Sequence, residues 1–149
     1  RGICIINEGR TETILNNEEF ISAPQTVGAA RISGCKNIYK FEKTAEDRQI
    51  FIPSLNIYLK TTENIKENRN YIGLRAHYFH FDEGENEIEC EIERVIEDVF
   101  STIIMLRPVN CGETSELIRI ETDKRQAAEL VSRRIIKIYI EPKDVLLLK

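Results

Sequence analysis

Cysteine and histidine are the side chains of this chain that do chemistry most readily, and their spacing decides which chemistry is open to them. No two cysteines form a CxxC pair, and none has metal-ligand spacing to a histidine. His77 and His80 are three residues apart, so on a strand they face opposite sides and do not share a metal. We therefore expect no metal site, and four free thiols in a reducing cytoplasm. The cysteines are Cys4, Cys35, Cys90 and Cys111.

Motif and charge content narrow the function classes further. The sequence has no GxxxxGKS or GxxxxGKT phosphate loop, so we expect no ATP hydrolysis and assign no catalytic residues. The net charge is -4, the pI is about 5.4, and aromatic residues make up 7%. A nucleic-acid or anionic-membrane partner needs a basic face, and single-stranded nucleic acid also needs stacking aromatics. The composition argues against both partners but allows a small local basic pocket.

The length suits one compact domain or two very small ones, with 149 residues, 42% of them hydrophobic and 31% charged. The apolar runs are only a few residues long, whereas a membrane span needs about 20. The first residue is Arg1, and no charged-then-apolar leader follows it. We therefore expect this chain to be a piece of a longer protein.

The elements that must position any site are mostly short strands. Apolar and polar residues alternate with a period of two in several segments, and turn residues separate those segments. One helix interrupts them, with Asp123 capping Lys124–Val131. Many short strands at this spacing predict a mainly β fold of small barrels, of the five-stranded OB type. The predicted strands are 37–43, 49–52, 55–59, 71–75, 87–93, 100–106, 117–120, 135–140 and 145–148.

Residues 1–33 differ from the rest. Residues 3–6 and 11–14 are strand-like around a glycine turn, and a short helix is expected between Asn17 and Pro24. Thr26 caps a second helix over Val27–Ile32. This segment has too little apolar surface to fold alone, so we expect it to be the edge of a missing domain.

The remainder of the chain reads as an internal repeat. Residues 34–38 (Gly-Cys-Lys-Asn-Ile) match residues 84–88 (Gly-Glu-Asn-Glu-Ile), and residues 72–79 match 138–145. The predicted division is therefore 1–33, 34–82 and 83–149. The pattern leaves open whether the two halves lie side by side or intertwine.

Residues 3–37 resemble the stretch that leaves the ATPase domain of an ABC importer ATP-binding subunit. They contain, in order, a strand with a glycine turn, an acidic Glu-Glu-Phe-Ile segment before proline, and an Ala-Ala-Arg-Ile-Ser-Gly-Cys-Lys-Asn segment. Residues 71–81 and 136–148 look like two later segments of the same family. The order and spacing of these segments carry the resemblance. Residues 34–37 are similar to the opening of the molybdate, tungstate or sulfate branch, and of small molybdate-binding modules.

The resemblance implies a C-terminal regulatory region built from tandem TOBE units, which are OB-like. Its partners would be a second copy of the subunit, the missing ATPase domain and, through that domain, the membrane permease subunits. ATP and magnesium would bind only to the missing domain. The region would work in the cytoplasm at the inner face of the cell membrane, sensing molybdate or tungstate and inhibiting transport.

The resemblance also implies an oxyanion site in the first half. The opening of the molybdate modules falls on Gly34, Cys35, Lys36 and Asn37. Their closing lysine falls on Arg75, and the first of two serines falls on His77. A tetrahedral dianion takes amide and hydroxyl donors together with one or two cations, which suits this set. In the second half, the matching positions include the acids Glu85 and Glu141, so we expect that half to bind no oxyanion.

Plainer readings stand beside these. Arg75 also fits a role in bracing strands, Lys36 fits a solvated charge, and Asn37 and Asn86 fit backbone caps in turns. Two other functions remain open at this stage. One is a structural dimerisation domain of an importer ATPase for another substrate, such as sulfate, a sugar or iron. The other is an independent oligonucleotide-binding barrel, which the charge and the low aromatic content disfavour.

Overall fold

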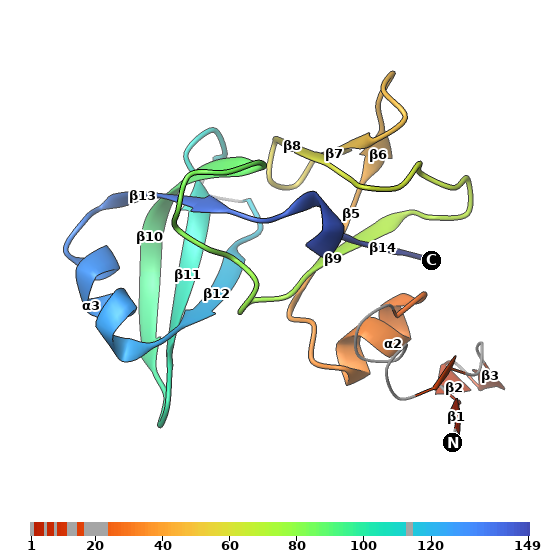
Figure 1. Cartoon of the computed structure of the whole chain (residues 1–149), viewed down its shortest axis with the longest axis horizontal. Coiled ribbons are helices and arrows are strands. Elements are labelled where there is room, and N and C mark those ends of the chain that lie inside the picture. The colour runs from red at the N-terminus through yellow and green to blue at the C-terminus, as the bar shows by residue number, and fades with distance from the viewer. Residues whose placement is uncertain (1, 5, 8, 12–14, 17–23, 113–114) are drawn as a thin grey trace.

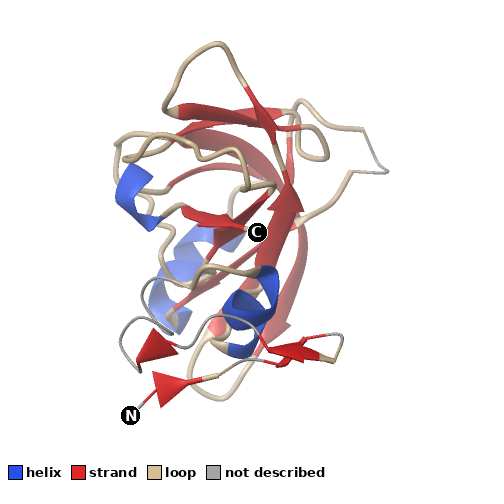
Figure 2. Cartoon of the chain, turned by 90° about the vertical axis from the view of Figure 1, so that its right-hand side faces the viewer, coloured by secondary structure: helices blue, strands red, loops and turns tan. Residues whose placement is uncertain are grey.

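The structure is a computed structural model of the whole chain, and it describes residues 2–4, 6–7, 9–11, 15–16, 24–112 and 115–149. Figure 1 shows two groups of strands side by side, with the N-terminal strands set apart beyond the helix α2 (Val27–Ile32). Figure 2 shows that strands form the body of the molecule. The mainly β fold predicted from the alternating pattern is therefore confirmed. None of the helices in these residues has the length and apolar character needed to cross a membrane.

The described residues of the N-terminal segment contain four two-residue strands. Strand β1 (Gly2–Ile3) pairs antiparallel with β4 (Leu15–Asn16), and β2 (Ile6–Asn7) pairs antiparallel with β3 (Arg10–Thr11). A hairpin therefore closes around the predicted glycine turn, between Ile6–Asn7 and Arg10–Thr11. Residues 5 and 12–14 of the two predicted strands lie outside the described residues. The helix predicted after Asn17 lies outside the described residues.

The two predicted helices that lie in the described residues, capped by Thr26 and Asp123, are confirmed. Helix α2 spans Val27–Ile32, and the Thr26 hydroxyl accepts a hydrogen bond from the Ala29 N–H at 3.1 Å. Helix α3 spans Lys124–Val131 and begins at the Asp123 cap. Gly34 follows Ser33, the C-cap of α2, and its φ of +98° lies in the left-handed region that glycine adopts without strain.

The first half of the repeat contains five strands. They are β5 (Asn37–Lys40), β6 (Glu42–Lys43), β7 (Gln49–Ile52), β8 (Ile57–Lys60) and β9 (Tyr71–Leu74). Strand β5 pairs with β9, while β6, β7 and β8 form a meander. All of these pairs are antiparallel.

The second half repeats this pairing scheme with longer strands. They are β10 (Glu87–Glu97), β11 (Thr102–Pro108), β12 (Ile118–Thr122) and β13 (Ile135–Tyr139). Strand β10 bulges between Ile92 and Arg94, pairs with β13 through its first part, and pairs with β11 along most of its length. Strand β10 thus takes the pairing positions that β5 and β6 have in the first half. The strand pairing of the two halves therefore shows the predicted repeat.

Two predicted strands begin two residues too early. The first is the strand predicted at 55–59, which begins at Ile57 as β8. The pattern placed a strand at 100–106, whereas β11 begins at Thr102. Phe100 instead lies in the turn that joins β10 to β11, where the Asp98 N–H donates to the Ser101 carbonyl at 3.0 Å. The alternation of apolar and polar residues cannot reveal such a turn, because an apolar residue next to a strand is counted as part of that strand.

The two halves cross over after their closing turns. Following β13, the 3-10 turn η1 (Pro142–Asp144) leads to β14 (Leu146–Leu148), which pairs with β9 of the first half. Following β9, His80 forms a two-way backbone bridge with Tyr139 of β13, with both N–O distances at 2.9 Å. The second half therefore adds a strand to the sheet of the first, and the first half returns a one-residue bridge to β13. Whether 34–82 and 83–149 are separate folding units stays a prediction.

A single apolar cluster runs through both halves. Its fully buried side chains come mostly from the inward-facing positions of strands in which inward and outward residues alternate, and both halves contribute. Because these side chains share one core, separating the halves would expose apolar surface in both. The largest fully buried side chains are Ile50, Ile52, Leu55, Leu59, Ile72, Leu74, Ile104, Leu106, Ile118, Ile120, Ile138 and Ile140.

Candidate functional site

The pairing of β5 with β9 brings the two segments of the candidate oxyanion site together. Asn37, at the start of β5, lies opposite Leu74, the last residue of β9. Residues 34–37 therefore lie next to Arg75, and His77 lies in the turn that follows. The six candidates divide by burial. Cys35, Asn37 and Arg75 are buried, and Gly34, Lys36 and His77 are exposed.

Asn37 is 2% exposed, and its amide is taken up by protein partners. Its Nδ2 donates to the Leu74 carbonyl at 2.9 Å and to the Arg119 carbonyl at 2.7 Å. Its Oδ1 accepts from the Arg119 N–H at 2.7 Å, and the Tyr39 hydroxyl lies 3.1 Å away. Both donor hydrogens are thus used, and the side chain joins β5 to β12 of the other half. This is the backbone-capping role that the sequence left open; a role as an anion ligand stays a prediction.

Arg75 also has a structural role. It is 3% exposed, and its guanidinium donates to the Ser33 carbonyl at 3.1 Å and to the Ser33 hydroxyl at 2.9 Å. Ser33 is the C-cap of α2, where a cation stabilises the carbonyls that the helix leaves without partners. Arg75 therefore fixes α2 on β9.

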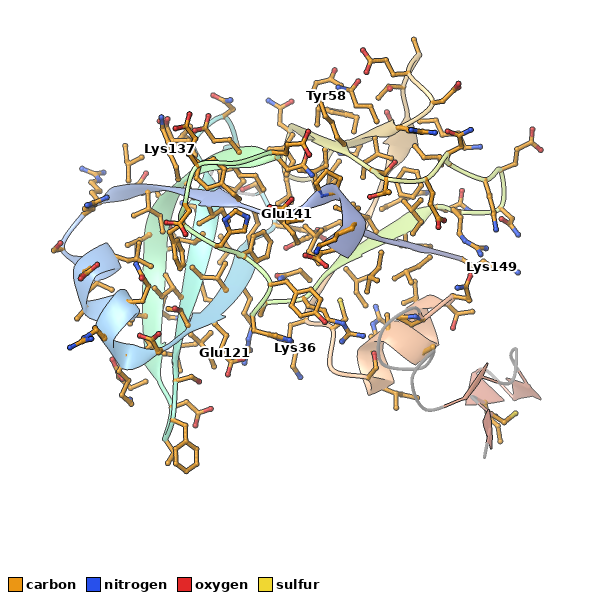
Figure 3. The ribbon with its side chains drawn as sticks, viewed as in Figure 1. Lys36, Tyr58, Glu121, Lys137, Glu141 and Lys149 are labelled. Atoms are coloured by element: carbon orange, nitrogen blue, oxygen red, sulfur yellow. The ribbon has the colours of Figure 1, made fainter. Side chains whose placement is uncertain are left out.

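Cys35 packs in a small apolar cluster with Ala30, Leu146 and Leu148, and the remaining candidates are exposed. Burial raises the pKa of the Cys35 thiol, although the nearby Arg75 guanidinium opposes that rise. Lys36, labelled in Figure 3, lies at the surface, and the exposed His77 ring contacts Tyr78 edge-on. An anion approaching this surface would meet Lys36 and His77, while the buried candidates lie below it with protein partners.

The strand register refines the match between the two halves. Ile38 lies opposite Gly73, and Ile88 lies opposite Ile138, so Gly73 corresponds to Ile138. The repeat predicted from the sequence paired Ile72 with Ile138, and it is therefore shifted by one residue at this strand. In register, Arg75 corresponds to Ile140, which is fully buried.

The second half has its own asparagine contact at the corresponding opening. The Asn86 Oδ1 accepts from the Lys60 N–H at 2.7 Å, and its Nδ2 donates to the Lys60 carbonyl at 3.0 Å. Lys60 ends β8, the counterpart of β12. Asn37 and Asn86 thus hold the halves together in reciprocal fashion, the first in the core and the second at the surface.

A different part of the molecule offers a cavity lined by cations. It has a volume of about 470 Å³ and lies between the β8–β9 loop, the η1–β14 segment and the linker before α2. Among its lining residues are Thr62, Glu63, Lys66 and Lys143, which are exposed. The cavity is thus open to solvent and has basic residues on two sides.

Arg69 is the buried cation of this cavity. It is 7% exposed, and its guanidinium donates to the Gln25 Oε1 at 2.6 Å and to the Asn68 Oδ1 at 3.2 Å. Both acceptors are neutral amides, and no carboxylate of the described residues lies within 4.0 Å of it. A guanidinium has five N–H donors, so three have no partner in the described part of the chain. No nitrogen of Arg69 is among the fully buried atoms that the described residues leave without a partner, so its free donors face the solvent of the cavity, where an anion would form charge-assisted hydrogen bonds with them.

Sequence reasoning missed Arg69 because no motif surrounds it. It stands in a polar loop, Lys-Glu-Asn-Arg-Asn, that reads as a solvated connection between strands. Its burial depends on Gln25, which lies 44 positions earlier, and on the C-terminal segment that returns to β9. The described residues hold no group of three or more His, Cys, Asp or Glu side chains arranged to bind a metal ion.

Comparison with known proteins identifies the fold. No family model matches the chain, and no curated protein sequence matches it. Among solved structures, it is similar to the cytoplasmic molybdate-binding protein ModG, solved with molybdate bound, with a TM-score of 0.57 and 13% sequence identity. The match covers 76% of this chain and 96% of that one. At this identity the likeness shows the fold alone, and the chain therefore has an OB-like β fold of the kind seen in that protein.

Proposed function

We propose that this chain is a non-catalytic regulatory unit that binds a tetrahedral oxyanion, molybdate or tungstate, in the cavity beside Arg69. The observation that carries the proposal is the buried guanidinium, whose protein partners in the described residues are neutral. The likeness to a molybdate-binding protein supports the choice of ligand.

The lining of the cavity suits such an anion. A guanidinium presents a planar fork of N–H donors that matches two oxygens of an oxyanion, and charge-assisted hydrogen bonds of this kind are the strong ones. Lys66 and Lys143 add point charges from two different segments, and the Thr62 hydroxyl is a further donor. Glu63 is the acid of the lining, and because it is exposed its repulsion is screened by solvent.

The same cavity is joined to the linker that precedes α2. Gln25 accepts from Arg69 through its side chain, and its backbone carbonyl accepts from the Lys149 N–H at 3.0 Å. The Lys149 carbonyl in turn accepts from the Val27 N–H at 3.3 Å. An anion that draws Arg69 toward the cavity would therefore alter the contact that holds residues 24–27 against the C-terminal strand.

The setting of this unit is part of the proposal. We place it in the cytoplasm at the inner face of the membrane, in the ATP-binding subunit of an ABC importer, paired with a second copy. The resemblance of residues 3–37, 71–81 and 136–148 to that family supports this placement. A rising internal oxyanion concentration would then act through the linker to stop uptake.

A second candidate function is a purely structural dimerisation unit of an importer for another substrate. The observation in its favour is that Asn37 and Arg75, two of the residues carried over from molybdate modules, bind the protein itself. The two functions differ in whether any oxyanion binds the chain.

Thermal unfolding with molybdate, tungstate or sulfate at matched ionic strength tests the proposal. A ligand at a hundredfold excess over its Kd stabilises the native state by about 2.7 kcal/mol. For a chain of this size, that raises the midpoint by about 5–10 °C. We expect this rise with molybdate or tungstate.

Two variants locate the site. Arg69→Gln should remove the ligand-induced rise, and Lys36→Glu should leave it intact. Each variant is compared with itself without ligand, so a change in its own stability does not affect the result. A rise that survives in Arg69→Gln but disappears in Lys36→Glu would place the anion at the surface near residues 34–37. No rise with any oxyanion would favour the structural unit.

A further inference from the structure

The hairpin that joins β10 to β11 presents two apolar side chains to solvent. Val99 is 75% exposed and Phe100 is 92% exposed. Figure 1 shows this hairpin projecting from the sheet beyond α3. Exposed apolar residues are ordinary when they are scattered singly, but two neighbours at the tip of a projecting hairpin form a compact apolar tip. We call residues 98–101 the tip.

The tip is held in one shape by its own hydrogen bonds. The Asp98 N–H donates to the Ser101 carbonyl at 3.0 Å, and the Asp98 carboxylate accepts from the Val99 N–H at 2.8 Å. The Ser101 hydroxyl donates to the Glu121 carboxylate at 2.8 Å, which fixes the tip to β12. A turn held in this way is ordered before any partner binds. A partner that covers Phe100 therefore causes little loss of conformational entropy in the turn.

A cavity of about 410 Å³, lined by both apolar and charged residues, lies between α3 and β13 of the same half. Its apolar lining comes from Phe81, Leu130, Ile136 and Tyr139, and Ile135 beside it is 49% exposed. The charged residues of the lining are Glu89, Arg133 and Lys137. Lys137 pairs with Glu87 at 3.6 Å, whereas Arg133 has no side-chain partner within the described part of the chain.

We propose that two copies of this chain pair reciprocally, each placing Val99 and Phe100 of its tip in the α3–β13 cavity of the other. The aromatic ring would cover the apolar lining, and the negative Asp98 would face the unpaired Arg133. Charge complementarity selects a second copy as the occupant, since one chain carries both an acidic apolar tip and a cation beside a partly apolar cavity. Two such contacts related by a twofold axis close on themselves and give a dimer rather than a fibre.

Sedimentation equilibrium over a range of concentrations tests this pairing on the chain as it is. We expect a monomer–dimer equilibrium in which Phe100→Ala raises the dissociation constant on the order of tenfold or more, as for a buried aromatic anchor. The side chain is nearly fully exposed in the monomer, so its removal should leave the thermal midpoint unchanged. Ile32→Ser is the matched control, because Ile32 is 63% exposed on α2, away from the tip and the cavity.

A charge exchange tests the seating of the tip. Asp98→Arg and Arg133→Asp should each weaken the dimer, and the double variant should restore it. A parent chain that stays monomeric, or a Phe100→Ala variant that dimerises like the parent, would overturn the proposal. A double variant no tighter than either single variant would show that the tip does not bind this cavity. None of these outcomes depends on oxyanion binding, so the pairing can fail while the oxyanion site stands. A monomeric parent chain would also count against the pairing with a second copy in the proposed setting, whereas the oxyanion assays would be unaffected.

Discussion

Replacing Asn37 with alanine should destabilise the fold far more than removing its counterpart Asn86. The Asn37 amide makes three hydrogen bonds of 2.7–2.9 Å that join β5 to both β9 and β12, and the side chain is 2% exposed. Each hydrogen bond contributes about 1 kcal/mol net, and alanine leaves the buried backbone groups without partners. The free energy of unfolding should therefore fall by about 3 kcal/mol or more. Urea unfolding measures this as a midpoint lowered on the order of 1 M, with the slope unchanged.

The control is Asn86→Gly, which removes the reciprocal pair of hydrogen bonds to Lys60 at the surface. Glycine is chosen because Asn86 has a φ of +55°, which would strain alanine. Water replaces the lost partners at this exposed place, so the cost should stay within about 1 kcal/mol. Equal losses for the two variants would refute the reasoning, because burial would then not decide the strength of these contacts.

Three further outcomes follow from the core and the helix cap. Gly73→Ala should cost about 1–3 kcal/mol in urea unfolding, because the added Cβ would lie 3.1 Å from the Cys35 Sγ and 3.2 Å from Leu148 Cδ1; a cost below the measurement error would contradict this packing. Burial raises the pKa of the Cys90 thiol to about 12. As the pH rises above the ordinary pKa of a thiol, Cys90 ionises first in the unfolded chain, so the free energy of unfolding should fall with pH, and it should fall less in Cys90→Ala. Identical pH profiles of the free energy of unfolding for the two proteins would argue against this. Asp123→Ala should cost about 1 kcal/mol through loss of the α3 cap, measured by the same unfolding, whereas Asp123→Ser should retain most of the stability.

The pattern of the sequence predicted the local elements well. The two capped helices follow from residues within four positions of each other, and the strands follow from alternation over four to seven residues. Local sequence rules apply over such short stretches of chain. The crossover between the halves is different, because nothing near Leu146 or His80 records which strand each will pair with. The packing of the shared core determines which strands pair.

The same limit explains the candidate site. The sequence placed Lys36, Asn37 and Arg75 near one another, but it left open whether their polar atoms face a ligand or the protein. Asn37 is taken up by Arg119, 82 positions away. Arg69 had no motif to mark it, and its burial comes from contacts with the linker and the C-terminal segment. Long-range contacts thus set the chemistry of both places.

The most direct test of oxyanion binding is a crystal of this chain grown with tungstate, with the tungsten located by its anomalous scattering. Our account predicts one strong peak in the cavity, within about 4 Å of the Arg69 guanidinium, a distance set by an oxygen bridging tungsten and an N–H donor. Lys66 and Lys143 should lie around the same peak. A peak at the surface beside Lys36 and His77, or no ordered tungsten in a crystal saturated with the anion, would contradict it.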